Sequence, residues 1–288
     1  MTGLLRQIRA SHWIKNLAVF LPVFFAGQIF QIFSDGEMLN LLILFVAFCL
    51  ASSTVYIIND LVDLPFDRKH PEKSKRPLAS GKIAKTTALL IGAVSLTLAI
   101  CLSILIGFAG LLVAGYFLLN LAYTFFLKKI SIVDAACIAI GFVIRVLAGG
   151  LVADVFVTHW ILIMVFLLGI SIIFAKRRSD LVESSGEQFR HAQQGYTLGF
   201  IDMAKTISLT LTMVVYLIYS VSEDVIARIG SDKLYITSLF VFLGIMRYLQ
   251  ISVVDQKAGD PVSTLLKDRF LQVVVFLWAI TFGLILYG

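Results

Sequence analysis

Nine runs of about 20 mostly apolar residues recur along this chain, and they constrain its fold more than any other feature. A membrane-spanning helix needs about 20 such residues to cross the hydrocarbon core of a bilayer. We therefore predict an all-α, polytopic membrane protein. The runs lie at residues 14–33, 39–60, 87–107, 109–127, 132–152, 159–178, 203–221, 234–253 and 268–287.

The composition agrees with this class. Of the 288 residues, 59% are hydrophobic and only 15% are charged, whereas soluble domains carry about 25% charged residues.

The three cysteines, Cys49, Cys101 and Cys137, lie in apolar runs without metal-ligand spacing, so we expect packing roles in a reducing environment. The first run lacks a signal-peptide cleavage site and is expected to stay in the protein. Without repeats or a soluble region, we predict a single domain over residues 1–288.

The loops between the runs differ sharply in charge. Of the 24 lysine and arginine residues, 20 fall in the N-terminal segment and in alternate loops. Positive residues mark the cytoplasmic side of a membrane protein. We therefore predict a cytoplasmic (inner) membrane protein with its N-terminus and large loops in the cytoplasm and its C-terminus outside. Because orientation accounts for the basic excess, we expect no nucleic-acid binding.

An acidic motif follows the second apolar run. Asp60, Asp63 and Asp67 are spaced i, i+3, i+7, which lines them up on one face if the helix continues past the membrane surface, where Pro65 could kink it. Asn59 lies four residues before Asp63 and can join them. Mg²⁺ takes a few carboxylate oxygens and shares the rest of its shell with substrate phosphates. We therefore predict that these carboxylates and Asn59 hold Mg²⁺; the alternative is a solvated, charged loop.

Basic side chains follow the acids. Lys73, Lys75 and Arg76 suit phosphate oxygens, although they could serve only as positive-inside signals. The pairing of acids and bases at one membrane face indicates chemistry on a metal-bound phosphate or diphosphate. Lys15 and Lys128, at cytoplasmic ends of apolar runs, could hold a lipid phosphate.

Arg145 lies near the middle of the fifth apolar run. A charge at that depth is costly, so Arg145 should face the protein interior and meet an anion. We expect either the phosphate of a lipid substrate or a buried ion pair that holds the helices together. Arg247 is closer to the end of its run and can snorkel. Asp134 and Asp154, at run ends, are expected to be solvated.

The string Asn59-Asp60-x-x-Asp63-x-x-x-Asp67 resembles the first aspartate-rich motif of the UbiA superfamily of intramembrane prenyltransferases. Other strings resemble its polyprenyl-phosphate (decaprenyl-phosphate) phosphoribosyltransferase branch. The resemblance implies nine transmembrane helices around a central polar cavity that opens to the cytoplasmic side. The further strings are Trp13-Ile14-Lys15-Asn16, His70-Pro71-x-Lys73-x-x-Arg76-Pro77-x-Ala79-Ser80-Gly81, Tyr123-Thr124 with Leu127-Lys128, and Gly141-Phe142-Val143-Ile144-Arg145 to Gly149-Gly150.

The resemblance also implies a reaction. A membrane polyprenyl phosphate would attack the anomeric carbon of 5-phosphoribosyl 1-diphosphate (PRPP), and diphosphate would leave. The product, a polyprenyl-phosphoryl 5-phosphoribose, would feed cell-wall arabinan synthesis. Mg²⁺ would neutralise the leaving diphosphate. Because the nucleophile is already an anion, a general base is hardly needed, and we assign no catalytic role to His70 or His191.

The chain departs from the aromatic prenyltransferases of the superfamily where these carry a second aspartate-rich motif. It has one acid beside three bases, in the string Lys176-Arg177-Arg178-Ser179-Asp180, and Arg190 and Tyr196 follow. One acidic and one basic cluster suit a donor with phosphates at two ends. The resemblance carries over Lys176, Arg177 and Asp180 as substrate-binding residues, and we add Tyr196. For the three bases, a positive-inside anchor is the alternative.

Two other functions remain open. An aromatic prenyltransferase would join a polyprenyl diphosphate to a quinone or haem precursor, but it would need the second aspartate cluster. A transporter would carry acids buried mid-span at corresponding places of two repeats. The acids here gather at one cytoplasmic face, which favours surface chemistry.

Overall fold

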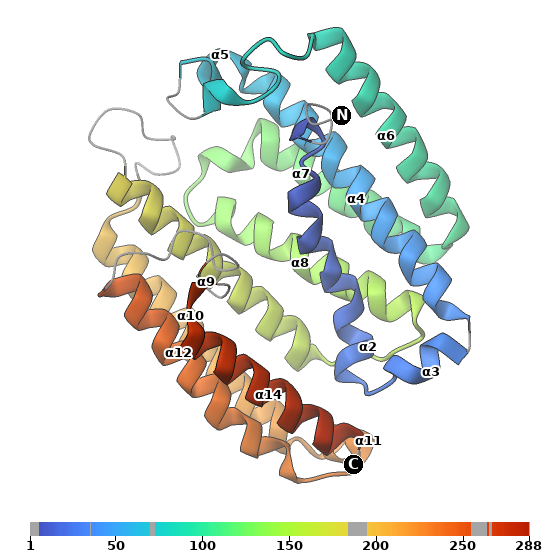
Figure 1. The fold of residues 1–288 in the computed structure, drawn as a ribbon, viewed down its shortest axis with the longest axis vertical. Coiled ribbons are helices and arrows are strands. Elements are labelled where there is room, and N and C mark those ends of the chain that lie inside the picture. The colour runs from blue at the N-terminus through green and yellow to red at the C-terminus, as the bar shows by residue number, and fades with distance from the viewer. Residues whose placement is uncertain are drawn as a thin grey trace. The chain divides into compact units, whose positions relative to one another are not determined.

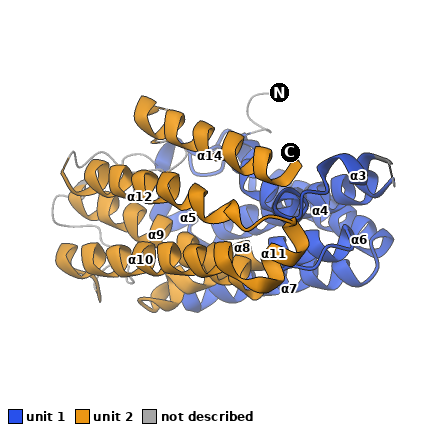
Figure 2. Ribbon diagram, turned by 90° about the horizontal axis from the view of Figure 1, so that it is seen from below, with its two compact units in different colours: residues 1–127, 144–157 blue, residues 128–143, 158–288 orange. Residues whose placement is uncertain are grey.

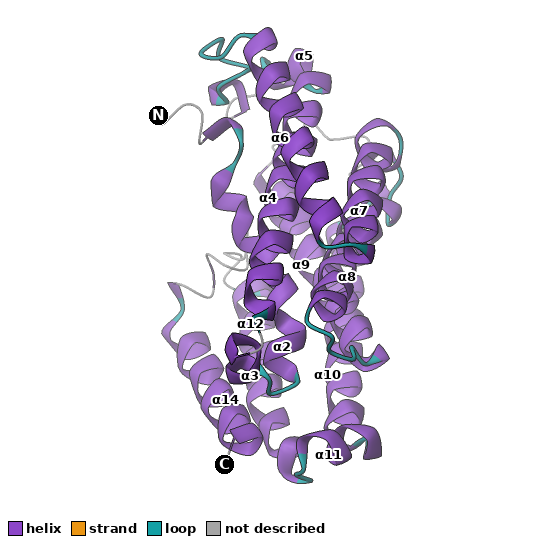
Figure 3. Ribbon diagram, turned by 90° about the vertical axis from the view of Figure 1, so that its right-hand side faces the viewer, coloured by secondary structure: helices purple, strands orange, loops and turns teal. Residues whose placement is uncertain are grey.

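We describe a computed structural model of the chain, in which residues 6–34, 36–69, 73–183, 195–254, 264 and 267–287 are placed. These residues form helices and connecting loops, with no strand among them (Figure 3). Within this part of the chain, eight helices are long and apolar enough to cross a membrane. The predicted all-α membrane architecture is therefore confirmed.

The chain divides into two compact units, coloured separately in Figure 2. The first comprises residues 1–127 and 144–157, and the second comprises residues 128–143 and 158–288, so helix α8 contributes to both. The first unit holds η1 (Ala10–Phe20), α2 (Leu21–Phe25), α3 (Ile29–Ser34), α4 (Glu37–Val62), α5 (Leu64–Asp67), η2 (Lys73–Lys75), α6 (Lys85–Leu105), α7 (Phe108–Phe125) and the second half of α8 (Val133–Val152). After η3 (Leu127–Lys129), the second unit holds the first half of α8, then α9 (His159–Glu183), α10 (Leu198–Val221), α11 (Glu223–Ile229), η5 (Lys233–Thr237), α12 (Ser238–Val253) and α14 (Arg269–Tyr287).

The first predicted span, residues 14–33, is interrupted and is not among the eight long apolar helices, so the predicted count of nine spans is not confirmed. It forms the 3₁₀-helix η1 and the short helices α2 and α3. Pro22 has no amide hydrogen to donate to the preceding turn, and Gly27 has a φ of 70° between α2 and α3. The other eight predicted runs correspond to the eight apolar helices, with η5 and α12 together making one of them.

Helix α4 lies at the centre of the first unit, alongside α6 and η1 (Figure 1). Leu41, Leu44 and Phe48 recur at helical spacing and are fully buried, so they anchor its core. The outer faces of α6 and α7 are apolar instead: Leu90 is 66% exposed and Phe108 is 72% exposed. Such faces are unfavourable in water and suit contact with lipid.

Helix α8 approaches η1 closely at Gly149. A Cβ atom at this position would overlap the backbone carbonyl of Val19. Glycine therefore permits the backbone contact between the two elements, as small residues do at interfaces of membrane helices.

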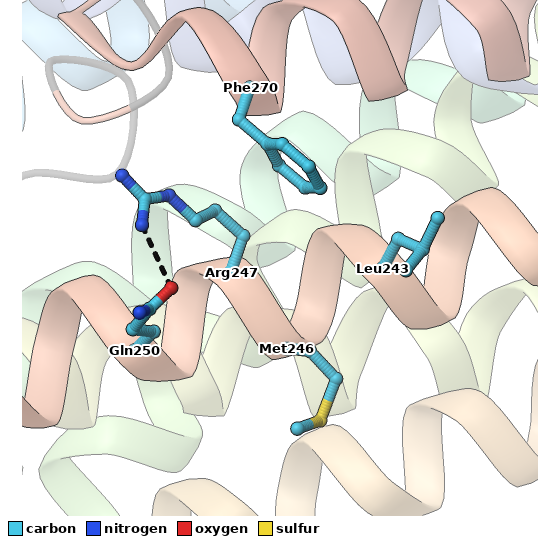
Figure 4. Close-up of a pocket in the computed structure, with 5 residues that line it drawn as sticks. All are labelled: Leu243, Met246, Arg247, Gln250 and Phe270. Carbon is cyan, nitrogen blue, oxygen red and sulfur yellow. Dashed lines mark hydrogen bonds between the residues drawn. The ribbon is translucent and has the colours of Figure 1, made fainter.

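In the second unit, α9 packs along α10, and α12 packs along α14 (Figure 1). Arg247 of α12 donates from Nη2 to Asp268 Oδ2 at 2.7 Å, and Asp268 Oδ1 accepts the Leu271 amide at 2.9 Å. Asp268 thus caps the start of α14, and the hydrogen bond from Arg247 lowers the pKa of its carboxyl group. Arg247 is ion-paired rather than simply snorkelling, and it also borders a pocket of about 400 Å³ with Leu243, Met246, Gln250 and Phe270 (Figure 4).

Candidate active site

The acidic motif lies where α4 ends and α5 begins. Pro65 starts the second helix and has no amide hydrogen to continue the first. Helical hydrogen bonding nevertheless passes through the junction, since Asp63 N donates to Asn59 O and Asp67 N donates to Asp63 O, each at 2.8 Å. The chain therefore keeps its helical course, and Asp60 and Asp67 come to lie near each other.

A single guanidinium joins these two carboxylates. Arg76 Nη1 lies 3.2 Å from Asp60 Oδ1 and 2.5 Å from Asp67 Oδ2. Both aspartates are only 4% exposed. Buried carboxylates need opposite charge, and Arg76 supplies it to both.

A second guanidinium, which the sequence did not single out, reaches the same site. Arg9 Nη2 lies 2.5 Å from Asp60 Oδ1, and the guanidinium carbon of Arg9 lies 4.7 Å from the centre of the Tyr56 ring. Arg9 is one arginine near the N-terminus, and no spacing relates it to the acidic motif. Only the packing of η1 against α4 brings it there.

Asp63 lies apart from this pair. It is half-buried at the helix junction, and its Oδ2 accepts a hydrogen bond from Asn59 Nδ2 at 3.0 Å. Among the described residues, no three histidine, cysteine or acidic side chains are gathered closely enough to hold a metal ion. The structure thus brings together Asp60 and Asp67 of the predicted metal ligands, and it pairs Asp63 with Asn59.

The donor set suits a hard divalent cation. The carboxylates of Asp60 and Asp67 both lie within hydrogen-bonding distance of one nitrogen of Arg76, so the two side chains present oxygens to a shared space. Asp63 and Asn59 add further oxygens one turn away in the sequence. An all-oxygen set that includes carboxylates is what Mg²⁺ prefers.

Four lysines predicted to bind phosphates are at least partly accessible. Lys15 on η1 is exposed, and Lys73 in η2 and Lys128 in η3 are half-buried. Lys176, in the last turns of α9, is exposed as well. His70, Pro71, Arg190 and His191 lie outside the described residues.

In the second unit, Arg177 joins a buried cluster. Its Nη2 donates to Asp134 Oδ2 at 2.6 Å, and its Nη1 lies 3.7 Å from Asp180 Oδ2. Tyr196 Oη donates to Asp134 Oδ1 at 2.8 Å. Burial raises the pKa of Tyr196 to about 12, so its hydroxyl stays protonated and able to donate at neutral pH.

Asp134 corrects one expectation. We expected a solvated residue at the end of a span, but its side chain is fully buried and paired with Arg177 and Tyr196. The sequence contained no signal for this contact, because Arg177 lies on α9, one helix further along the chain.

A second buried network lies beside this cluster. Arg178 Nε donates to Asp202 Oδ1 at 2.9 Å, and the fully buried Lys205 donates to Asp202 Oδ1 at 3.0 Å and to Ser252 Oγ at 2.6 Å. These bonds connect α9, α10 and α12. Arg178 therefore has a structural partner, in keeping with its place outside the predicted phosphate-binding set.

Arg145 faces the interior of the first unit, as predicted. It is 5% exposed, donates from Nε to Asn16 Oδ1 at 2.7 Å and from Nη2 to Tyr116 Oη at 2.9 Å. Its guanidinium carbon also lies 4.3 Å from the centre of the Tyr116 ring. These bonds hold η1, α7 and α8 together.

Comparison with known proteins places the chain in a family. The UbiA prenyltransferase family matches residues 19–280, through both units. The decaprenyl-phosphate phosphoribosyltransferase of Mycolicibacterium smegmatis is 30% identical, over 100% of this chain and 93% of the relative. The protein of the same name from Corynebacterium glutamicum is 28% identical, over 99% of this chain and 87% of the relative.

Among solved structures, a UbiA homologue from Archaeoglobus fulgidus bound to DMAPP and Mg²⁺ shares the fold. The TM-score is 0.70 at 18% sequence identity, and the alignment covers 98% of each chain. The family match over most of the sequence and the apolar helices of the structure lead to the same assignment. The chain is an integral, multi-pass membrane protein and belongs to the UbiA prenyltransferase family.

Proposed function

We propose that this protein transfers 5-phosphoribose from PRPP to a membrane polyprenyl phosphate and releases diphosphate. The observation that carries the proposal is the difference between two polar regions. One holds the paired carboxylates Asp60 and Asp67, and the other, at the end of α9, holds the bases Lys176 and Arg177, with Arg177 paired to Asp134 and close to Asp180. The two phosphoribosyltransferases that are about 30% identical to the chain support the same reaction.

The acidic side of the site would receive the diphosphate of the donor. Mg²⁺, when bound, supplies the positive charge that neutralises a leaving diphosphate. Asp60 and Asp67 would hold it, together with Asp63 and Asn59. Arg76, which already reaches both buried carboxylates, would bind diphosphate oxygens with Lys73.

The bond changes are simple. An oxygen of the polyprenyl phosphate forms a bond to C1 of the ribose, while the bond from C1 to the diphosphate oxygen breaks and its electron pair leaves with diphosphate. Oxocarbenium-like charge builds on the ribose in between. The protein's task is to orient two anions and balance their charge, which needs fixed cations rather than a general base.

The remaining predicted residues would bind the other two phosphates. Lys176 is an exposed cation at the end of α9, and with Arg177 it is proposed for the 5-phosphate of the donor. Asp180 and Tyr196 are proposed as further substrate-binding residues. Lys15, Lys128 and Arg145 are proposed for the phosphate of the lipid. The charge distribution supports a cytoplasmic-membrane enzyme whose site opens to the cytoplasm. We further propose that the lipid product serves cell-wall arabinan synthesis.

The test compares two donor and acceptor pairs on the same purified protein in lipid nanodiscs. One reaction contains PRPP and a polyprenyl phosphate; the other contains a polyprenyl diphosphate and an aromatic acid. Each is run with Mg²⁺ and with excess EDTA, and the lipid products are identified by mass spectrometry.

The proposal predicts a polyprenyl-phosphoryl phosphoribose from the first pair, in the presence of Mg²⁺ only. A prenylated aromatic product from the second pair, with nothing from the first, would identify an aromatic prenyltransferase instead.

A further inference from the structure

We propose that Arg9 is the displaceable counter-ion of the acidic site: it holds Asp60 while no divalent cation is bound and gives up this carboxylate when the cation binds. The inference rests on the proposed function, because it takes Asp60 and Asp67 as ligands of the cation. It adds a residue, Arg9, that neither the aspartate-rich motif nor the basic string after it contains.

Burial makes a counter-ion necessary. Asp60 is 4% exposed, and removing an ionised carboxylate from water is costly unless opposite charge replaces the lost hydration. Arg9 supplies such charge at 2.5 Å, and only 17% of its own side chain is exposed. The pair therefore stabilises the protein without its cation.

The same contact competes with the cation. Arg9 and Arg76 both bond to one atom, Asp60 Oδ1. A divalent cation bound to Asp60 would need this carboxylate and would repel both guanidinium groups at such short range. One of them has to withdraw before the carboxylate is fully available.

Arg9 is better placed to withdraw than Arg76. Arg76 holds two carboxylates, Asp60 and Asp67, whereas within the described part of the chain the ion pair of Arg9 is with Asp60 alone. The Arg9 guanidinium also lies over the Tyr56 ring, which can keep it as a cation–π partner after release. In addition, Arg9 has a φ of 51°, a left-handed conformation that arginine rarely adopts, so release lets this backbone relax.

The pairing of Arg9 with Asp60 and the binding of the cation to Asp60 are therefore linked equilibria. If Arg9 and the cation compete for Asp60, removing the arginine must tighten cation binding and must also destabilise the cation-free protein. Removal of an arginine with a purely structural role would destabilise the cation-free protein without tightening cation binding. The sign of the change in cation affinity therefore separates a displaceable counter-ion from an ordinary ion pair.

The experiment measures Mn²⁺ binding to the full chain in lipid nanodiscs, by the electron paramagnetic resonance signal of free Mn²⁺ and without any substrate. Arg9→Gln removes the charge, and Arg6→Gln is the matched control because it makes the same change at an exposed residue one turn earlier. Arg9→Gln should bind Mn²⁺ about 5- to 50-fold more tightly than the wild type, since one charge-assisted hydrogen bond no longer competes. Arg6→Gln should stay within about twofold, the range of a screened surface charge.

A second measurement uses only the wild-type protein, so its result does not depend on whether a variant folds. The amides of Arg9 and His12 are hydrogen-bonded within the first turn, to Arg6 O and Arg9 O. If Mn²⁺ displaces Arg9, hydrogen–deuterium exchange over residues 6–16 should become faster on adding Mn²⁺. Slower or unchanged exchange, with Mn²⁺ bound, would overturn the proposal.

The two proposals fail in different ways. Mn²⁺ binding that is lost in Asp60→Asn but unaltered or weaker in Arg9→Gln would overturn the role of Arg9 and leave the metal site standing. A wild-type protein that binds no Mn²⁺, or binds it equally well as Asp60→Asn, would overturn both this inference and the metal assignment of the proposed function.

Discussion

Asp60 and Asp67 are buried carboxylates whose charges are balanced by arginines from two different segments, η1 and the loop after α5. Such a cluster is expensive to build for stability alone, because desolvation offsets much of the attraction between the charges. We propose that a cation and a phosphate bind there, which would account for its place at the end of a membrane helix.

Replacing Asp67 tests whether this carboxylate is a ligand of the metal ion. Asp67→Asn keeps the size of the side chain and a hydrogen-bond acceptor but removes the charge, so transfer should slow by about 100-fold or more. The rate is measured with saturating PRPP and lipid phosphate over a series of Mg²⁺ concentrations. Asp232→Asn, at an exposed residue before η5, is the control and should keep the wild-type rate. Wild-type turnover by Asp67→Asn at ordinary Mg²⁺ would contradict the assignment.

Arg177 and Asp134 give a second prediction at this scale. Arg177→Met leaves Asp134 buried without its charged partner and should lower the free energy of unfolding by about 3–5 kcal/mol. Adding Asp134→Asn removes the orphaned charge and should recover most of that loss. Chemical unfolding in detergent micelles measures both variants. If Arg177→Met unfolds like the wild type, the ion pair with Asp134 contributes little to stability.

The residues of the acidic motif could be predicted from the sequence because they are close neighbours in it. Helical spacing relates Asp60 to Asp67, and the structure confirms that both reach one nitrogen of Arg76, whereas Asp63 pairs with Asn59 instead of joining them. Arg9 and Asp134 could not be found this way, because their partners are distant in the sequence and are chosen by tertiary packing. Burial of a polar residue at a span end depends on the neighbouring helix, which composition does not reveal.

At the scale of elements, the main departure from the sequence-based expectation is the interrupted first span. Its length and apolar character predict one helix, but Pro22 and Gly27 break it, and Asn16 turns inward to Arg145. The interrupted span carries two residues of the proposals, Lys15 within η1 and Arg9 at its N-terminal cap. The other eight spans could be predicted because long apolar runs leave the backbone no alternative in a bilayer.

The contact between α8 and η1 gives a prediction for this scale. Gly149→Ala places a methyl group against the backbone of Val19 and should lower the melting temperature, at a cost of about 1–3 kcal/mol. Gly115→Ala on α7 is the matched control, because a Cβ there meets no atom within 4 Å. Differential scanning fluorimetry of both variants in detergent compares them. Equal melting temperatures would show that η1 can shift away from α8 at no cost.

At the scale of the whole molecule, the family fold leaves the choice of substrate to a few residues. Two relatives that are about 30% identical to the chain are named decaprenyl-phosphate phosphoribosyltransferases, whereas a solved UbiA homologue with a similar fold is bound to DMAPP. A fold shared at 18% identity does not select between such donors. The replacement of a second aspartate cluster by Lys176, Arg177 and a single acid is the feature of this chain that favours a donor with a separate phosphate.

The central claim is that 5-phosphoribose, and not diphosphate, moves to the lipid. The most direct measurement uses PRPP that carries radiocarbon in its ribose and radiophosphorus in its β-phosphate, with purified protein, polyprenyl phosphate and Mg²⁺. Our account predicts that radiocarbon enters the organic phase while radiophosphorus stays in the aqueous phase as diphosphate, and that EDTA abolishes the transfer. Radiophosphorus in the lipid, or no transfer of either label by folded protein, would contradict it.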